Sequence, residues 1–376
     1  MFKKSLAAVA VLAAFAGSAY AADVTMYGRV DLGLRYTNVD TDRTGHDDVN
    51  TFEMASGNYT GSRFGVKGEE DLGNGMKVGF VLENGFSADD GNFGTADKLF
   101  DRQASLHLKG SFGEVAFGRM GIMNSTAGTF GIGQLSALET GWGSVGDQNL
   151  IWGAGFGSRY DNMVTYATPE FAGAKVIAQY SFGKTDADTK SVEGKPTTDR
   201  YAGIGVTYNA NNLALRAIVD TINKKSGPSS EVDGDVDDTI RVTLGGSYDF
   251  GVVKPFLAAS YFKDGSVGKI FSHDDILANG AVYDGYGVML GANAPLFGGT
   301  LKATAGYLKA DQQGVEAGKK AEDIDRFIVG AGYEYKLSKR TLVYADAGYG
   351  QDDVDNRTDG DKPAYFRAAF GMAHYF

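Results

Sequence analysis

The chain has 376 residues, with 36 basic and 47 acidic side chains and no cysteine. The lack of cysteine excludes disulfides and thiolate metal sites, and the acidic balance argues against a nucleic-acid partner. Glycine is abundant at 54 residues, Phe and Tyr number 23 and 20, and proline is rare at 6. This composition favours one large, continuous, bending sheet.

The first 21 residues have the pattern of a secretory signal peptide. Lys3 and Lys4 precede the apolar run LAAVAVLAAFA, and AYA at 19–21 follows as an A-x-A cleavage site. That run is too short for a membrane helix, and no later apolar run approaches the roughly 20 residues that such a helix needs. We expect cleavage near Ala21/Ala22 and a single domain over 22–376, because no linker divides this part of the chain.

A hairpin is predicted at residues 63–86, RFGVKGEEDLGNGMKVGFVLENGF, around the tight turn LGNG. Successive side chains of a strand point to opposite faces. One face of this hairpin carries the apolar residues Phe64, Val66, Met76, Val78, Phe80 and Leu82. The other carries the charged residues Arg63, Lys67, Glu69, Lys77 and Glu83.

The longest connection runs over about 120–158. Irregular loops beyond about 12–15 residues are uncommon in compact folds unless they are functional. Most of its large residues are apolar: Ile122, Met123, Phe130, Ile132, Leu135, Leu138, Trp142, Leu150, Ile151, Trp152 and Phe156. An outward loop of this composition would expose an adhesive patch, so we expect it to fold inward. Packing over the rim is the alternative.

The alternation of apolar and polar residues continues to the last residue. At 240–250 and 326–337, apolar side chains alternate with polar ones. We count roughly sixteen such runs, many near the 9–11 residues that a tilted strand needs to cross a bilayer. The connections alternate between short turns, such as 72–75, and long polar loops, such as the one expected near 38–57, and the chain ends on the aromatic Phe376. Both features are typical of an outer-membrane barrel with an apolar face toward lipid and water inside.

Five segments, in order, carry a family resemblance: MYGRVDLG, SRFGVKGEEDLGNGMKVGFVLE, RQASLHLKGSFGEVAFGR, SRYDNMVTYATPEFAG and FGMAHYF. With them the sequence resembles the general porins of Gram-negative outer membranes, most closely the neisserial and betaproteobacterial type. The resemblance implies an all-β fold, a transmembrane antiparallel barrel of 16 strands with the third long loop, 120–158, folded into the lumen. It also implies an outer-membrane homotrimer for passive diffusion of small hydrophilic solutes and ions.

The same resemblance implies contacts with outer-membrane lipid and lipopolysaccharide, and with the assembly machinery through Phe376. It implies no cofactor and no enzymatic reaction. The four histidines are scattered, without the spacing of a zinc site. The run EVDGDVDD at 231–238 lacks the closing Glu of a calcium loop, because Leu244 stands in that place.

Four arginines match family positions on the wall opposite the long loop: Arg29, Arg63, Arg102 and Arg159. Alternation points Arg29, Arg63 and Arg159 away from their apolar neighbours, whereas Ala104, Leu106 and Leu108 give Arg102 the opposite phase. An inward placement is expected, because an arginine facing lipid near mid-bilayer would cost about 2–4 kcal/mol. Asp31, Lys67 and Glu83 are further candidates for lining the lumen.

The long loop offers two acids, Glu139 and Asp147. Arginines on one wall and these carboxylates on the other would create a transverse field. Four basic against two acidic groups favour small anions at the narrowest point, whereas acidic loops at 40–48 and 231–238 favour cations at the mouth.

A substrate-specific channel and a barrel enzyme, such as a lipase, remain alternative functions. For the enzyme, neither His107 nor His374 has an evident catalytic partner in the sequence.

Overall fold

The computed structural model describes residues 23–138, 149–153, 155–183, 199–224, 237–268, 281–315 and 318–376. Within these ranges the chain is almost entirely β-structure, with one short helix, α2 (Asn149–Trp152). The strands are β1 (Thr25–Asp40), β2 (Val49–Ser56), β3 (Arg63–Gly73), β4 (Met76–Gly85), β5 (Gln103–Gly110), β6 (Gly113–Gly121), β7 (Arg159–Ala167), β8 (Ala174–Ser181), β9 (Arg200–Ala210), β10 (Leu213–Asn223), β11 (Thr239–Tyr248), β12 (Lys254–Gly265), β13 (Val282–Leu296), β14 (Gly299–Gln313), β15 (Ile324–Lys336), β16 (Thr341–Val354) and β17 (Ala364–Tyr375). No helix among the described residues is both long and apolar enough to cross a membrane.

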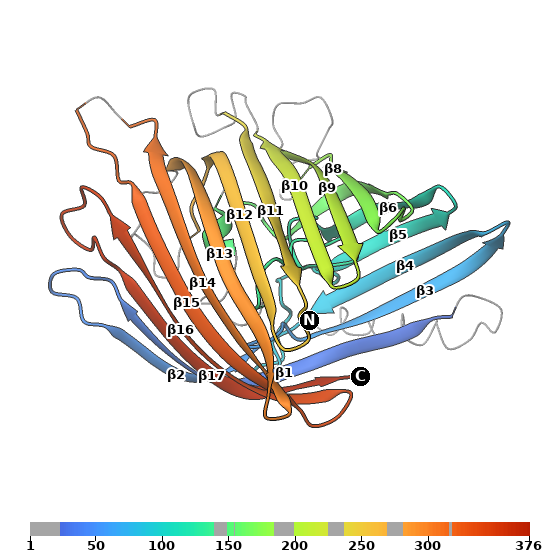
Figure 1. Cartoon of the computed structure of the whole chain (residues 1–376), viewed down its shortest axis with the longest axis horizontal. Helices are drawn as coiled ribbons and strands as arrows, with labels where there is room; N and C mark the ends of the chain where they lie inside the picture. Colours follow the sequence, from blue (N-terminus) through green and yellow to red (C-terminus); the bar gives the residue numbers. More distant parts are fainter. Residues whose placement is uncertain are drawn as a thin grey trace.

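The strands form one closed antiparallel barrel. Each strand from β3 onward pairs with the next, and β17 returns to pair with β1 from Arg29↔Tyr375 to Asp40↔Ala364. Figure 1 shows β10 to β17 side by side in chain order, with β17 beside β1. Because β2 and β3 pair with successive halves of β1, they share one place in the wall. The seventeen strands therefore fill sixteen places, which confirms the expected 16-stranded barrel.

The shared place of β2 and β3 differs from the sequence prediction. A long loop was expected near 38–57, but β1 reaches Asp40 and β2 occupies Val49–Ser56. The pairing with β1 breaks at 57–62 instead. The prediction failed because β2 is short and alternates only Phe52 and Met54 with polar residues, a weak strand signal. The wall is thus interrupted by a six-residue segment that returns to it at Arg63.

Burial confirms the orientation of the alternating residues. On β11, Leu244 is 55% exposed on the outside of the barrel, whereas Arg241 is 3% and Thr243 0% exposed. The same holds on β15, where Phe327 and Val329 are exposed and Arg326 is fully buried. The outer surface is therefore apolar and the inner face polar, as a membrane barrel requires.

The connections alternate in length as expected. The turn between β3 and β4 places Asn74 and Gly75 at φ values of 53° and 75°. Two successive residues with positive φ define the tight hairpin turn for which Asn-Gly is the preferred sequence. A two-residue turn likewise joins β9 to β10, whereas residues 86–102 join β4 to β5. One end of the barrel therefore carries the short turns and the other the long connections.

The outward position of Leu244, in the middle of β11, gives a test of the lipid-facing surface. Leu244→Arg should lower the free energy of unfolding in lipid vesicles by about 2–4 kcal/mol, because it places a charge near mid-bilayer. Leu337→Arg is the matched control, since Leu337 is equally exposed but lies in a short turn at the barrel edge. That variant should lose only about 0–1 kcal/mol. Equal losses in urea titrations would contradict the orientation.

Candidate functional site

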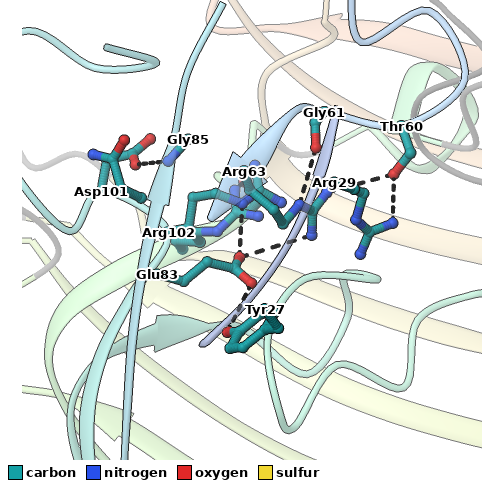
Figure 2. A network of polar contacts seen from close by, with 12 residues as sticks. Tyr27, Arg29, Thr60, Gly61, Arg63, Glu83, Gly85, Asp101 and Arg102 are labelled. Carbon is teal, nitrogen blue, oxygen red and sulfur yellow. Dashed lines mark hydrogen bonds and ion pairs between the residues drawn. The ribbon is translucent and has the colours of Figure 1, made fainter. Parts of the chain in front are cut away.

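The four predicted arginines lie in one part of the wall, which β1 and β3 to β7 form. Arg29 is on β1, Arg63 and Arg159 begin β3 and β7, and Arg102 lies immediately before β5. The β1–β3 register places Arg29 directly opposite Arg63. Figure 2 shows Arg29, Arg63 and Arg102 near one another. We call these four residues the arginine cluster.

The carboxylate of Glu83, on β4, lies between two of these arginines. It accepts a hydrogen bond from Arg102 Nε at 2.7 Å, and Arg63 Nη1 lies 3.7 Å from the same oxygen. The hydroxyl of Tyr27 donates to the other oxygen at 3.1 Å. These contacts place Arg102 beside Arg63. The alternation with Ala104, Leu106 and Leu108 instead predicted that Arg102 faces lipid. Because Arg102 precedes the first residue of β5, the alternation of that strand does not extend to it.

The remaining two arginines of the cluster have neutral partners. Arg29 Nη1 donates to Thr60 Oγ1 at 2.9 Å, and Arg159 Nη1 donates to Ser158 Oγ at 3.1 Å. Neither contacts a carboxylate among the residues that the structure describes. Glu83 is thus the one carboxylate that contacts the cluster directly among the described residues, so four cations keep an excess of positive charge.

Asp31 has a different environment from the one expected of a lumen-lining residue. It is fully buried, and one carboxylate oxygen accepts hydrogen bonds from the backbone N–H groups of Tyr59 and Thr60 at 2.8 and 2.6 Å. The other oxygen accepts a bond from the Tyr344 hydroxyl at 2.6 Å. The ring of Tyr59 stacks on that of Tyr344, with centroids 5.3 Å apart. Asp31 therefore holds the 57–62 segment against β16.

Three other predicted residues lie apart from the cluster or outside the structure. Lys67 is exposed, and its ammonium lies 5.4 Å from the centre of the Tyr27 ring. Glu139 and Asp147 fall in 139–148, outside the described residues. The transverse field expected between arginines and loop acids therefore stays a prediction.

A second set of inward arginines is paired with acids, and sequence analysis did not single it out as a site. Arg241 forms a two-pronged hydrogen bond with Asp220 at 3.0 and 2.7 Å. Arg326 does the same with Asp352 at 2.6 and 2.8 Å. All four side chains are almost completely buried. Their inward phase was visible in the sequence, but their partners come from neighbouring strands and depend on register.

These ion pairs also bind the long connection between β6 and β7. Arg326 Nη1 donates to the carbonyl of Leu150 at 3.0 Å, and the guanidinium of Arg241 lies 4.0 Å from the centre of the Phe156 ring. Gln179, on β8, accepts a bond from the backbone N–H of Met123 at 2.7 Å. Residues of this connection thus contact the inner face of strands as far apart as β8 and β15.

The same connection approaches the wall closely at glycines. A Cβ atom on Gly287, in β13, would lie 2.0 Å from the carbonyl oxygen of Ile151. One on Gly306, in β14, would lie 2.7 Å from the Ile151 side chain. Ile151 and Trp152 are fully buried against Phe262, Met289 and Ile328. Only a glycine at 287 lets the connection lie this close to β13.

His107 has partners that the sequence did not reveal. Its two ring nitrogens lie 2.8 Å from Ser105 Oγ and 2.8 Å from a Glu114 oxygen. Ser105 also accepts a bond from the Gln103 amide, whose nitrogen donates to Thr129 of the long connection as well. The His107 ring stacks on Phe130, with centroids 5.8 Å apart. This chain of hydrogen bonds ends on the loop. Gln103, Ser105 and His107 occupy alternate positions along β5 and therefore share one face of the strand. This spacing in the sequence could have predicted that they contact one another.

The described residues contain no group of three or more His, Cys, Asp or Glu side chains arranged to hold a metal ion. The inner face carries fixed positive charge at the arginine cluster. It also carries the buried ion pairs of Arg241 and Arg326, against which the long connection packs.

Comparison with known proteins identifies this architecture. A sequence model of the Gram-negative porin family matches residues 8–356. The outer membrane porin protein of Bordetella pertussis is 34% identical over 380 residues, covering 93% of this chain and 94% of the relative. Outer membrane porin protein 32 of Delftia acidovorans is also 34% identical, covering 92% of this chain and 89% of the relative.

Among solved structures, the anion-selective porin from Comamonas acidovorans superposes with a TM-score of 0.69 at 26% identity. The match covers 94% of this chain and all of that one. The fold is thus that of an outer-membrane channel. The chain belongs to the Gram-negative porin family.

The contact at Gly287 can be tested by fluorescence. Gly287→Ala should push Ile151 off β13 and expose the adjacent Trp152, because the added methyl group overlaps a backbone carbonyl. In a Trp142→Phe background, Trp152 is the one remaining tryptophan, and its emission should shift to the red. Gly268→Ala is the control, since its Cβ would meet nothing within 4 Å. An unchanged spectrum for Gly287→Ala would contradict the close packing.

Proposed function

We propose that this porin is a passive, water-filled channel for small hydrophilic solutes and ions, and that its narrowest zone prefers small anions. Family membership supports the channel itself. The observation that carries the anion preference is the arginine cluster, in which four cations have one carboxylate, Glu83, in direct contact. Fixed charge in a narrow wet passage selects permeating ions by sign.

The narrow zone is built, in this proposal, by the 120–158 connection together with the 57–62 segment. The contacts of Met123 with β8 and of Leu150 with β15 support a course across the interior. Leu138, near the described end of the connection, packs with Tyr59 of the 57–62 segment. The two segments meet there, which leaves the remaining opening bordered by the arginine cluster.

Acidic loops at the long-connection end oppose this preference. Asp42, Asp47 and Asp48 are exposed there. The backbone N–H of Thr44 donates to Asp359 and lowers the pKa of that carboxyl, so it stays ionised at neutral pH. Charges at a wide mouth are screened over about 8–10 Å at physiological salt. Charges in the narrow zone act at contact distance, so the arginines dominate selectivity.

We propose no enzymatic activity. The Ser105–His107–Glu114 arrangement has the residue types of a hydrolase triad. Ser105 is 5% exposed, however, and its neighbour His107 lies beneath Phe130 of the long connection. A nucleophile must be reachable by its substrate. The arrangement is better explained as a structural contact that holds Thr129 and Phe130 of the long connection against β5.

The proposal extends to the assembled protein. The family resemblance supports a homotrimer in outer-membrane lipid and lipopolysaccharide and delivery by the assembly machinery through Phe376. The signal-peptide pattern supports cleavage after Ala21. The C-terminal residue has a structural role as well, since its backbone exchanges two hydrogen bonds of 3.0 Å with Gly28 on β1. Phe376 therefore closes the barrel seam.

The test is the reversal potential in a planar bilayer under a potassium chloride gradient. Wild-type protein should show ohmic current with a reversal potential on the chloride side. Arg63→Gln with Arg102→Gln should move the reversal potential toward potassium, because two of the four cluster charges are lost. Arg340→Gln, in an exposed turn, should leave it unchanged. A cation-selective wild type, or no effect of the double variant, would overturn the proposal.

A further inference from the structure

A pocket of about 430 Å³ lies on the inner face, between residues 131–135 of the long connection and strands β10 to β13. Arg216, Ser247, Lys254 and Gln134 line it, together with the ring of Phe256. Lys254 begins β12 and Ser247 is the penultimate residue of β11, so the pocket is near the short-turn end of the wall.

The two basic side chains of this pocket have neutral partners. Arg216 Nη1 donates to Asn209 Oδ1 at 3.0 Å and to the carbonyl of Leu215 at 2.7 Å. The ammonium of Lys254 lies 5.3 Å from the centre of the Phe256 ring. Neither contacts a carboxylate in the part of the chain that the structure describes. Among the described residues, the pocket therefore carries two positive charges without a carboxylate partner.

Other basic residues on the same wall contrast with this pair. Arg241 is bound by Asp220, Arg326 by Asp352, and Lys302 lies 3.1 Å from Glu334. A partly enclosed cation is costly unless an anion accompanies it. At Arg216 and Lys254 the described part of the chain supplies no such anion, so an anion from solution can take that place.

The pocket is separate from the arginine cluster. The cluster lies on β1, β3 and β7 and just before β5. Arg102 and Arg159 adjoin long connections, and Arg63 lies where the wall is interrupted at 57–62. Arg216 and Lys254 lie on β10 and β12, close to the short turns that precede these strands. The two groups therefore lie on different strands of the wall.

We propose that Arg216 and Lys254 form a second anion-binding site, which takes a small oxyanion such as inorganic phosphate. A guanidinium supplies paired donors that match two oxygens of such an ion, and an ammonium supplies a point charge for a third. The Gln134 amide and the Ser247 hydroxyl offer neutral donors in the same pocket. This site deepens the proposed anion preference and rests on it for its role in transport.

The first test is block of the chloride current by phosphate in single-channel recordings. In wild type, added phosphate should reduce the current to a saturating level. Arg216→Gln with Lys254→Gln should need about tenfold more phosphate for half block, since two charge-assisted hydrogen-bonding groups are lost. Its phosphate-free reversal potential should stay on the chloride side, because the arginine cluster is intact.

The matched control is Lys336→Gln with Arg340→Gln. It removes the same charge at the same end of the barrel, but from exposed positions outside the pocket. The control should block like wild type. An unchanged half-block concentration in the pocket variant, or an equal shift in the control, would overturn the proposal, the latter by showing a general effect of surface charge.

A second measurement locates the ion without relying on conduction. Wild-type crystals soaked in selenate should give an anomalous peak between Arg216 and Lys254, and crystals of the pocket variant should lack it. Selenate at the arginine cluster alone would overturn the second site and leave the proposed function in place. If selenate binds in the pocket but the reversal potential shows cation selectivity, the second site stands and the proposed anion selectivity is rejected.

Discussion

A lipid bilayer gives the polypeptide backbone no hydrogen-bonding partner, and this constraint shapes the rest of the molecule. Every strand edge within the membrane must be paired, so β17 returns to β1 and the terminal Phe376 bonds Gly28 across the seam. Closure separates two surfaces. Apolar residues such as Leu244 face outward, and polar residues such as Thr243 and Arg241 are confined inside.

The confined charges fall into two groups with different consequences. Arg241 and Arg326 are neutralised by Asp220 and Asp352, and they hold the long connection against the wall. Removing one partner of such a buried pair typically costs about 3–5 kcal/mol, because the other is left uncompensated. In the arginine cluster one carboxylate, Glu83, directly contacts the group of four cations, and an excess of positive charge remains. Paired charges thus maintain the structure, whereas in the proposed function the excess charge acts on the solute.

Periodicity and loop lengths predicted the architecture well, because alternation along a strand is a local property. The outward phase of β11 and β15 and the Asn-Gly turn at 74–75 followed directly from neighbouring residues. The sequence did not show the β2 strand, whose alternation is short, or the break at 57–62 that Asp31 stabilises. That break depends on Tyr344, some 313 residues away, which no local pattern can reveal.

The site was predictable in its residues but not in its pairing. Three of the four cluster arginines had an inward phase in the sequence, whereas Arg102 needed the structure, because it lies before the strand whose phase was applied to it. Glu83 was expected among lumen residues, but its position between Arg63 and Arg102 follows from the register of β3, β4 and β5. Loop contacts such as Ile151 with Gly287 depend on three-dimensional packing alone.

The central claim is that the arginine cluster borders the narrowest part of the water path. The chain has no cysteine, so Gly61→Cys provides one thiol, and its Cβ would lie 3.4 Å from Arg102 Nη1 and 3.8 Å from Arg63 Nη2. Single-channel current should be recorded while a sulfonate-bearing thiol reagent is added. The account predicts a stepwise fall in chloride current and a shift of the reversal potential toward cations. Complete modification, verified by mass, with no change in current or selectivity would contradict it.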